Sequence, residues 1–445
     1  MAWAVPCNSI LALSAHIVHF FSRPYRQLQT VSQSTYRERS IFGVFARICL
    51  TMVGFQNFIL MRIVLFLFFF ASTSLVAQKY TVKFNLKDSL KRLFKEECVA
   101  TNFSGVMLVA KEGKPLCYLA NGYRDYEKKS SLRKTDIFEL ASVSKQFTAL
   151  IIMMLQERGK LGIDDPLNKW IKGLPFEGVS IRHMLTHTSG LPDYQAIMDK
   201  HWDKSKVADN IDAIEYLKKY PEPLHFKPGE KYEYSNTGYL LLASIAEVAS
   251  DANFIQLMHS WVFQPAQMKS ADFRTPIMKA RISNMAQGHK LDPVSKQYRN
   301  ALRDPESNYT IWLGNRKGPG RISASALDLL KWDQALYTPM FIAKTTLLEA
   351  FSPHTLLDGT ISNYGFGWET ELHPKLGRIV AHSGDNPGYR TYIKRYIDQN
   401  YVVILLNNNE SNRMSNILSR IDMLISNKLV FDNADGSMDP LRRRE

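Results

Sequence analysis

The sequence predicts an α+β protein in which an antiparallel sheet is flanked by terminal helices and carries an inserted all-helical domain. Three observations lead to this fold class. Strand-like segments occur near both ends of the chain, helices precede the first of them and follow the last, and the long stretch between is mainly helical or looped. A sheet assembled from both ends of a chain, with helices between, is an α+β arrangement.

The individual elements follow from hydrophobic periodicity and turn residues. Apolar residues at helical spacing predict terminal helices over 84–98 and 411–428. Alternating or continuous apolar segments bounded by turn residues predict strands, which we expect over 105–110, 115–120, 379–383, 389–397 and 401–406. The same periodicity as in the terminal helices predicts further helices over 180–186, 207–219, 237–249 and 253–260.

These elements predict a division into two domains. Residues 78–145 and 315–430 would form a discontinuous sheet domain, residues 146–314 a mainly helical domain, and residues 431–445 a flexible tail. Cys98 and Cys117 follow the leader, and we expect both to be core thiols because two cysteines do not make a disulfide framework.

Residues 61–77 have the pattern of a secretory signal peptide, with one arginine, a short apolar run and small residues before Gln78. Such segments belong at an N-terminus, so we expect Met61 to be the true start and residues 1–60 to be an over-extended reading frame. A membrane anchor formed from 41–77 is the alternative, but Arg47 and Arg62 interrupt it. The mature protein is therefore expected to be exported to the periplasm.

The net charge of +14 is spread along the chain, apart from three consecutive arginines at 442–444. Nucleic-acid binding requires a clustered basic patch, so no nucleic-acid partner is expected. The net positive charge indicates either a soluble basic surface or a general attraction to anionic cell-envelope polymers. The expected partner is a small-molecule or peptide substrate, cell-wall peptide included; the membrane enters only through the export signal, and the oligomeric state stays open.

Ser142 and Lys145 stand three residues apart at the start of a helix that is apolar on every side, which is typical of a helix at the centre of a large domain. The spacing places both side chains on one face. A serine hydroxyl becomes nucleophilic when a nearby base accepts its proton, and Lys145 could be that base. The Ser-x-x-Lys pattern is typical of penicillin-recognising enzymes, whereas the structural alternative makes Ser142 a helix cap and Lys145 a solvated residue.

Two later segments add chemistry to this pair. Tyr234-Ser235-Asn236 precedes a helix, where Asn236 or Thr237 could cap the helix; in the catalytic interpretation Tyr234 relays a proton and Asn236 holds a substrate carbonyl. His382-Ser383-Gly384 ends a strand, and Gly384 would let substrate backbone approach. The backbone N–H groups of Asp385 and Ser142 would then form an oxyanion hole.

Together, in this order, the three segments resemble the motifs of the serine β-lactamase and penicillin-binding-protein superfamily, in the class C-like branch that contains D-Ala-D-Ala carboxypeptidases, D-aminopeptidases and esterases. The phrases Lys227-Pro-Gly229, Tyr364-Gly-Phe-Gly-Trp368 and Gly384-Asp-Asn-Pro-Gly388 are also similar to that branch. The resemblance covers about 85–428 and implies a five-stranded antiparallel sheet packed on a helical domain, with the site between them.

The resemblance implies acylation of Ser142, proton transfer by Lys145 and Tyr234, and substrate binding by Asn236, His382, Ser383 and Gly384, without metal or cofactor. Whether Lys145 or Tyr234 is the working base is left open. One departure matters: antibiotic-hydrolysing members carry lysine where this chain has His382, and a histidine that is neutral above a pKa of about 6.5 holds a carboxylate less firmly. A carboxypeptidase or esterase is therefore favoured over an efficient β-lactamase.

His183 and His187 have a zinc-ligand spacing, but no third ligand is evident, and we expect them to hydrogen-bond a buried loop. The sequence thus predicts an exported serine hydrolase that forms a Ser142 acyl-enzyme with a D-amino-acid peptide, a small ester or a β-lactam. The alternative is a catalytically inactive relative that binds cell wall or self-assembles. Specificity should depend on the loops at 191–210 and 290–320, which sequence alone does not fold.

Overall fold

The computed structural model describes residues 84–434. The predicted reading-frame extension and signal peptide lie outside these residues, as does the tail beyond 434. The tail was predicted to begin at 431, but the last helix continues to Ala434.

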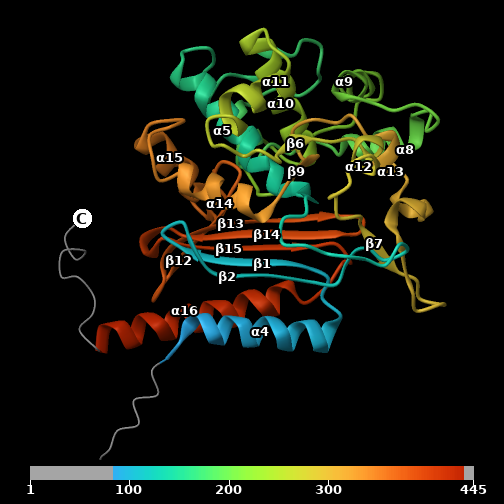
Figure 1. Ribbon diagram of the computed structural model, residues 1–445. Helices are drawn as coiled ribbons and strands as arrows, with labels where there is room; N and C mark the ends of the chain where they lie inside the picture. The colour runs from blue at the N-terminus through green and yellow to red at the C-terminus, as the bar shows by residue number, and fades with distance from the viewer. Residues whose placement is uncertain (1–83, 435–445) are drawn as a thin grey trace, which may run out of the picture. The chain divides into compact units, whose positions relative to one another are not determined.

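The fold is built on a six-stranded sheet whose neighbours all run antiparallel (Figure 1). Its strands, in spatial order, are β12 (Glu369–His373), β13 (Gly377–Asn386), β14 (Tyr389–Tyr396), β15 (Tyr401–Asn407), β1 (Gly105–Lys111) and β2 (Lys114–Asn121). The predicted hairpin and late strands are confirmed, and β1 pairs with β15, which joins the two ends of the described chain. The predicted α+β class is confirmed.

The expected five strands were one too few. β12 was missed because its segment is polar and short, with the exposed residues Glu371 and Leu372 at its centre. Such a pattern is typical of an edge strand, which needs no apolar side chains on both faces and carries charges that discourage pairing with other chains. β12 pairs with β13 from Glu369 opposite Ala381 to His373 opposite Gly377.

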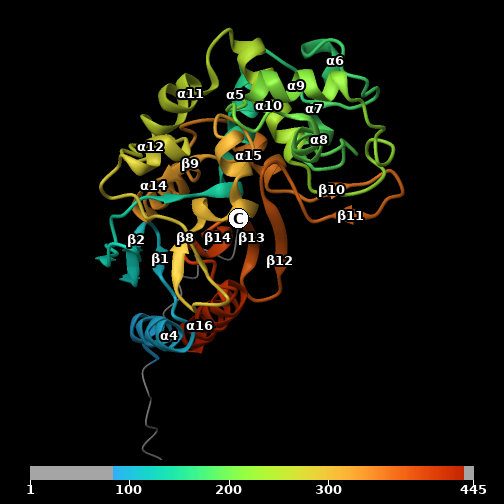
Figure 2. The same ribbon diagram turned by 90° about the vertical axis from the view of Figure 1, so that its right-hand side faces the viewer.

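The two terminal helices, α4 (Leu86–Thr101) and α16 (Met414–Ala434), lie side by side under one face of the sheet (Figures 1 and 2). α4 begins where the Asn85 side chain accepts the Asp88 N–H, and it ends at Asn102 with φ 52°. Leu90, at the centre of its apolar stripe, is fully buried against this face of the sheet. Both predicted terminal helices are confirmed.

The other face of the sheet is covered by the helical part of the chain (Figure 1). Its helices are α5 (Lys145–Glu157), α6 (Leu167–Trp170), α7 (Ile181–Leu185), α8 (Tyr194–His201), α9 (Asn210–Lys219), α10 (Asn236–Ser250), α11 (Phe254–Leu257), α12 (Pro276–Ala280), α13 (Tyr309–Trp312), α14 (Ala326–Ala335) and α15 (Lys344–Ala350). Every residue of α5 from Lys145 to Leu155 is buried, as an all-round apolar helix predicts. The predicted helix at 253–260 is instead α11 followed by a π-helical turn, η4 (Met258–Phe263).

Short strands and turns connect these layers. The strands are β3 (Tyr123–Asp125), β4 (Ser130–Ser131), β5 (Phe138–Glu139), β6 (Asp272–Phe273), β7 (His289–Leu291), β8 (Tyr298–Asn300), β9 (Ile322–Ala324), β10 (His354–Thr355) and β11 (Ile361–Ser362), and the 3₁₀ turns are η3 (Ala141–Ser144), η5 (Ala301–Arg303), η6 (Pro305–Ser307) and η7 (Ile397–Gln399). β5, β9 and β6 form a small sheet directly before the nucleophile turn.

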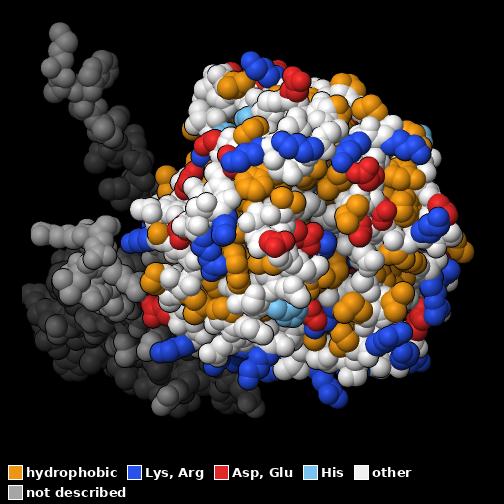
Figure 3. Space-filling model, turned by 90° about the horizontal axis from the view of Figure 1, so that it is seen from above, with side chains coloured by type: hydrophobic (Ala, Val, Ile, Leu, Met, Phe, Trp, Pro, Cys, Tyr) orange, Lys and Arg blue, Asp and Glu red, His pale blue; other side chains and the backbone are white. Residues whose placement is uncertain are grey.

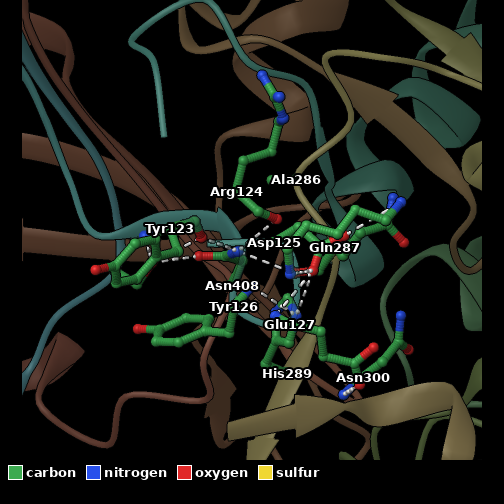
Figure 4. Close-up of polar contacts among 12 residues, drawn as sticks. Tyr123, Arg124, Asp125, Tyr126, Glu127, Ala286, Gln287, His289, Asn300 and Asn408 are labelled. Carbon is green, nitrogen blue, oxygen red and sulfur yellow. Dashed lines mark hydrogen bonds and ion pairs between the residues drawn. The ribbon is translucent and has the colours of Figure 1, made fainter. Parts of the chain in front are cut away.

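A polar cluster fastens the outer hairpins to the end of β15 (Figure 4). The Asn408 amide donates to the carbonyls of Tyr123 at 2.9 Å and Gln287 at 2.8 Å, and His289 Nε2 accepts the Tyr126 N–H at 3.2 Å. The β3–β4 and β7–β8 hairpins are thereby tied to Asn408, the residue directly after β15. No signal in the sequence pointed to this cluster.

Charged side chains of both signs are interspersed on the face seen in Figure 3, which agrees with a dispersed rather than clustered positive charge. Within residues 84–434 no single helix is long and apolar enough to cross a membrane; α10 together with the α11–η4 segment reaches that length, but the two are bent by 83°. Cys98 and Cys117 are free; Cys117 is buried in the core, as expected, whereas Cys98 is only partly buried.

Candidate active site

Ser142 lies in the 3₁₀ turn η3, one turn before α5 begins at Lys145. In a 3₁₀ turn residues i and i+3 are eclipsed, so the turn brings the Ser142 and Lys145 side chains together. Ala141, directly before the nucleophile, has φ 49°, a left-handed conformation that an alanine adopts at a cost of roughly 1–2 kcal/mol. The strain therefore lies directly before the expected nucleophile.

The Lys145 amine is held by three oxygen atoms. Its Nζ lies 3.1 Å from Ser142 Oγ, 2.8 Å from Asn236 Oδ1 and 3.1 Å from the Pro319 carbonyl. A neutral amine has two N–H donors and one lone pair. The carbonyl oxygens of Asn236 and Pro319 can only accept, so they take both donors and leave the lone pair directed at the Ser142 hydroxyl.

Lys145 is fully buried, at 0% exposure, and no carboxylate in residues 84–434 forms an ion pair with it. Burial, and to a smaller extent the positive charge of Arg316, lowers the pKa of Lys145 well below its usual range. A lysine acts as a base only in its neutral form, and burial favours that form here. The neutral amine can then accept the Ser142 proton.

Tyr234 and Asn236 are carried to Lys145 by the segment that enters α10. The helix is capped by Ser235, whose side chain accepts the Gly238 N–H at 3.2 Å, so the structural alternative in which Asn236 or Thr237 caps it is wrong. With Ser235 as the cap, the Asn236 side chain is free to accept from Lys145. Lys145 Nζ lies 4.6 Å from the centre of the Tyr234 ring.

The Tyr234 hydroxyl interacts with Ser142. Desolvation raises the pKa of Tyr234 above its ordinary value, and a hydrogen bond with Ser142 opposes that shift. The residue as a whole is 40% exposed, while its hydroxyl is desolvated beside Ser142. A phenol in this position stays protonated at neutral pH and can hand a proton to a leaving group.

His187 fixes this segment from beneath. Its Nδ1 accepts the Ser235 N–H at 3.0 Å, and its ring lies 4.3 Å from that of Tyr234. His183 Nδ1 accepts the Ser180 N–H at 3.2 Å within the capping box of α7. Both histidines therefore hydrogen-bond backbone, as expected, and no group of three or more metal-ligating side chains is found in residues 84–434.

His382 is buried behind the crevice, at 1% exposure. Its Nδ1 lies 2.6 Å from the Ser383 carbonyl, which can only accept, so Nδ1 carries the proton. Nε2 then accepts from the Tyr364 hydroxyl at 2.8 Å. Burial, with a smaller effect from Lys145, lowers the pKa of His382 to about 3, so the ring is neutral and supplies no positive charge for a substrate carboxylate.

The neighbouring residues of β13 reach the crevice through an exposed strand edge. β12 pairs with β13 only as far as Ala381, whereas β13 continues to Asn386, and within the described chain no strand pairs with residues 382–386 on the β12 side. Ser383 and Asp385 are exposed on this stretch. An extended substrate can lie along such an edge.

Gly384 accommodates the nucleophile turn rather than substrate. A Cβ at this position would lie 2.2 Å from the Leu140 carbonyl oxygen, which also accepts the Thr391 hydroxyl at 2.7 Å. The close approach that glycine permits is thus between β13 and the residue two before Ser142. It places the Asp385 backbone beside the nucleophile turn, where the expected oxyanion hole would be.

A buried ionic network that sequence reasoning missed supports the turn from behind. The Glu139 carboxylate accepts from Lys279 and, at 2.7 Å, from the Asn386 amide, and Arg321 Nη1 lies 3.6 Å away. Desolvation alone would raise the pKa of Glu139, but the charges of Lys279 and Arg321 lower it overall. Glu139 precedes the Ser-x-x-Lys motif by three residues, and no periodicity marks it as more than a strand residue.

Ser142, Lys145, Tyr234 and Asn236 thus meet at one point, Ser383 and Asp385 line an adjacent strand edge, and His382 and Gly384 lie beneath the surface. An unprotonated amine at a serine hydroxyl, with a phenol alongside, can move a proton from nucleophile to leaving group. Such an arrangement is typical of serine hydrolases.

The comparisons with known proteins agree. A family model described as Beta-lactamase matches residues 90–424. Penicillin-binding protein 4* of Bacillus subtilis (strain 168) is 40% identical over 330 residues, which cover 74% of this chain and 73% of that protein. Protein flp of Staphylococcus aureus (strain MW2) is 28% identical over 336 residues, which cover 72% of this chain but only 62% of flp, less than two thirds of its length.

Among solved structures, a penicillin-binding protein from Bacillus halodurans superimposes with a TM-score of 0.65 at 25% identity, covering 75% of this chain and 98% of that one. The matched region of the family model contains all three motifs and every residue of the site described above. The chain therefore belongs to the Beta-lactamase family, within the superfamily of serine β-lactamases and penicillin-binding proteins.

Proposed function

We propose that this protein is an exported serine hydrolase that forms an acyl-enzyme at Ser142 with an ester or amide. The observation that carries the proposal is the contact of 3.1 Å between Ser142 Oγ and a fully buried Lys145 amine that has no carboxylate partner in the described chain. An inactive relative has no use for such an amine, because burying a lysine without a carboxylate lowers stability.

The reaction follows from these positions. Ser142 Oγ attacks the carbonyl carbon as its proton passes to Lys145 Nζ, and the carbonyl oxygen becomes an oxyanion held by the N–H groups of Ser142 and Asp385. The bond to the leaving group then breaks, and the proton is returned to the leaving group from Lys145 directly or through Tyr234. Asn236 both accepts from Lys145 and presents its amide to the substrate. Water repeats the sequence on the acyl-enzyme and releases the acid.

The substrate class is a D-amino-acid peptide, a small ester or a β-lactam, and a carboxypeptidase or esterase is favoured over an efficient β-lactamase. Neutral, buried His382 supports this order because it supplies no cation for the carboxylate that β-lactam antibiotics carry. Export is proposed from the signal-peptide pattern at 61–77. N-terminal sequencing of the secreted protein would test it, and a mature protein that retains this segment would contradict it.

Covalent labelling tests the acyl-enzyme. A fluorophosphonate probe and a fluorescent penicillin should label the wild-type protein, and the Ser142→Ala variant should not be labelled. Peptide mapping should place the adduct on Ser142 and not on Ser144, the other serine of the turn, whose hydroxyl is buried and accepts the Ile322 N–H. An absence of labelling in both proteins would instead support the inactive, cell-wall-binding or self-assembling relative.

A further inference from the structure

A carboxylate stands beside the exposed edge of β13. Glu369 begins β12 opposite Ala381, and Tyr392 of β14 lies opposite Ser383. The Glu369 carboxylate accepts from the Tyr392 hydroxyl at 3.4 Å. Residues that face one another across antiparallel strands project on the same side of the sheet, as do residues two apart in one strand. Glu369 is therefore a diagonal neighbour of Ser383 on one sheet face.

The charge of Glu369 reaches the groups that line the crevice. It raises the pKa of both Tyr232 and Tyr234, although in each case desolvation has the larger effect. Burial raises the pKa of the Glu369 carboxyl, and the Tyr392 hydroxyl, the N–H and hydroxyl of Ser383 and the charge of Lys394 each lower it by less. The carboxylate thus occupies the surroundings of Ser383, where a substrate that lies along the strand edge would pass.

The edge offers no free cation. Within residues 84–434 no ion pair is formed by Glu369, and the basic groups around it are engaged elsewhere. Lys394 Nζ lies 2.8 Å from Asp422, Arg390 lies 3.2 Å from Asp385, and His382 is neutral. A cavity of about 290 Å³ opens beside Glu369 on the sheet face that α16 covers, and Glu371, Ala381, Tyr392 and the paired Lys394 also line it, so there is room for a group beside the carboxylate.

We propose that Glu369 sets the charge preference of the crevice: it favours substrates that carry an ammonium group beside the scissile bond and disfavours those that carry a carboxylate there. The inference rests on the proposed function and narrows its substrate class. A substrate carboxylate at Ser383 would lie next to Glu369 and repel it, whereas an ammonium group would pair with it. A like charge within about 8 Å, at an effective dielectric constant of about 20, changes a rate constant by about tenfold or more.

Three thioesters that share the same acyl group but differ in their leaving groups test this preference. N-acetyl-D-alanyl esters of thiocholine, of its uncharged tert-butyl isostere and of mercaptopropionate differ mainly in the charge of the leaving group. Thiol release, followed with a chromogenic disulfide, gives kcat/KM for each ester. The wild-type protein should prefer the thiocholine ester to the mercaptopropionate ester, and Glu369→Gln should reduce that ratio by about tenfold, while the uncharged ester changes little.

Glu371→Gln is the matched control. Glu371 lies in the same strand, two residues further from Ser383 and opposite Ile379, and its side chain is 51% exposed. The variant removes the same charge and should leave the ratio unchanged. An equal shift in Glu371→Gln would show a general field effect and overturn the assignment to Glu369, as would an unchanged ratio in Glu369→Gln.

A binding measurement separates failure of this inference from failure of the proposed function. If the wild-type protein releases no thiol from any ester, the hydrolase proposal fails. The charge preference is then tested by binding alone: the thermal unfolding temperature of the Ser142→Ala variant is measured with each intact ester. Stronger stabilisation by the thiocholine ester, lost in Ser142→Ala/Glu369→Gln, supports the inference, and equal stabilisation by all three esters overturns it.

Discussion

Replacing Lys145 by methionine should change how the stability of the fold depends on pH. The amine is fully buried and has no carboxylate partner in residues 84–434, so the folded state favours its neutral form and its pKa lies well below the usual range. In the unfolded chain a lysine has a pKa of about 10.4. Between these two values the unfolded chain binds one more proton than the folded protein, so wild-type stability rises with pH.

The magnitude follows from linkage. Each pH unit in which Lys145 is neutral in the folded state and protonated in the unfolded chain adds about 1.4 kcal/mol to the free energy of unfolding. Lys145→Met lacks this proton, and it also loses the hydrogen bonds to Asn236 and Pro319, worth about 1 kcal/mol each at any pH. The difference in unfolding free energy between the two proteins should therefore move in favour of the wild type as the pH rises toward about 10.4.

Urea unfolding of both proteins at intervals of about one pH unit between about pH 7 and pH 10 measures this difference. Lys160→Met, which removes an exposed lysine just beyond α5, is the control and should give a curve parallel to that of the wild type. Parallel curves for Lys145→Met and the wild type would mean that Lys145 is protonated in the folded state, and the reasoning that makes it the base would be refuted. Labelling by the fluorophosphonate probe should fall by about 10²-fold or more in Lys145→Met.

Three further predictions concern the surroundings of this base. Tyr234→Phe should slow labelling by about 10²-fold without altering stability by more than about 1 kcal/mol, because only a hydroxyl is lost; an unchanged labelling rate would assign proton transfer to Lys145 alone. Gly384→Ala places a Cβ 2.2 Å from the Leu140 carbonyl and should cost about 1–3 kcal/mol in urea unfolding and slow labelling; a fully stable variant would contradict the close approach. Tyr364→Phe leaves His382 Nε2 buried without a donor and should destabilise the fold by about 1–3 kcal/mol in urea unfolding at neutral pH; unchanged stability would contradict the buried hydrogen bond between Tyr364 and His382.

The sequence predicted what depends on neighbouring residues. The contact between Ser142 and Lys145 spans three positions, so any helical turn at this segment brings the two together. α4 and α16 were predictable from their apolar stripes, and the β1–β2 hairpin from the turn between its strands. In these elements the relative positions of the side chains depend on local backbone geometry and not on tertiary contacts.

The charge state and orientation of the site could not be predicted in this way. The pKa of Lys145 lies well below its usual range because the amine is buried and, to a smaller extent, because of the Arg316 charge, and its contact with Asn236 joins residues 91 positions apart. The sequence predicted that His382 faces the substrate, but in β13 its ring is turned inward to Tyr364, whereas the next residue, Ser383, is exposed. Spacing along the chain gives no information about solvent exposure at either position.

The sequence by itself determined the α+β class, the terminal helices, most strands and the order of the three motifs, because periodicity and turn residues act within single elements. Only the tertiary structure decided that Glu139 meets Asn386 across 247 positions, that Gly384 accommodates Leu140, and that Glu369 stands beside Ser383. Such contacts depend on how the elements pack against one another, and the pKa of every group in the crevice depends on that packing.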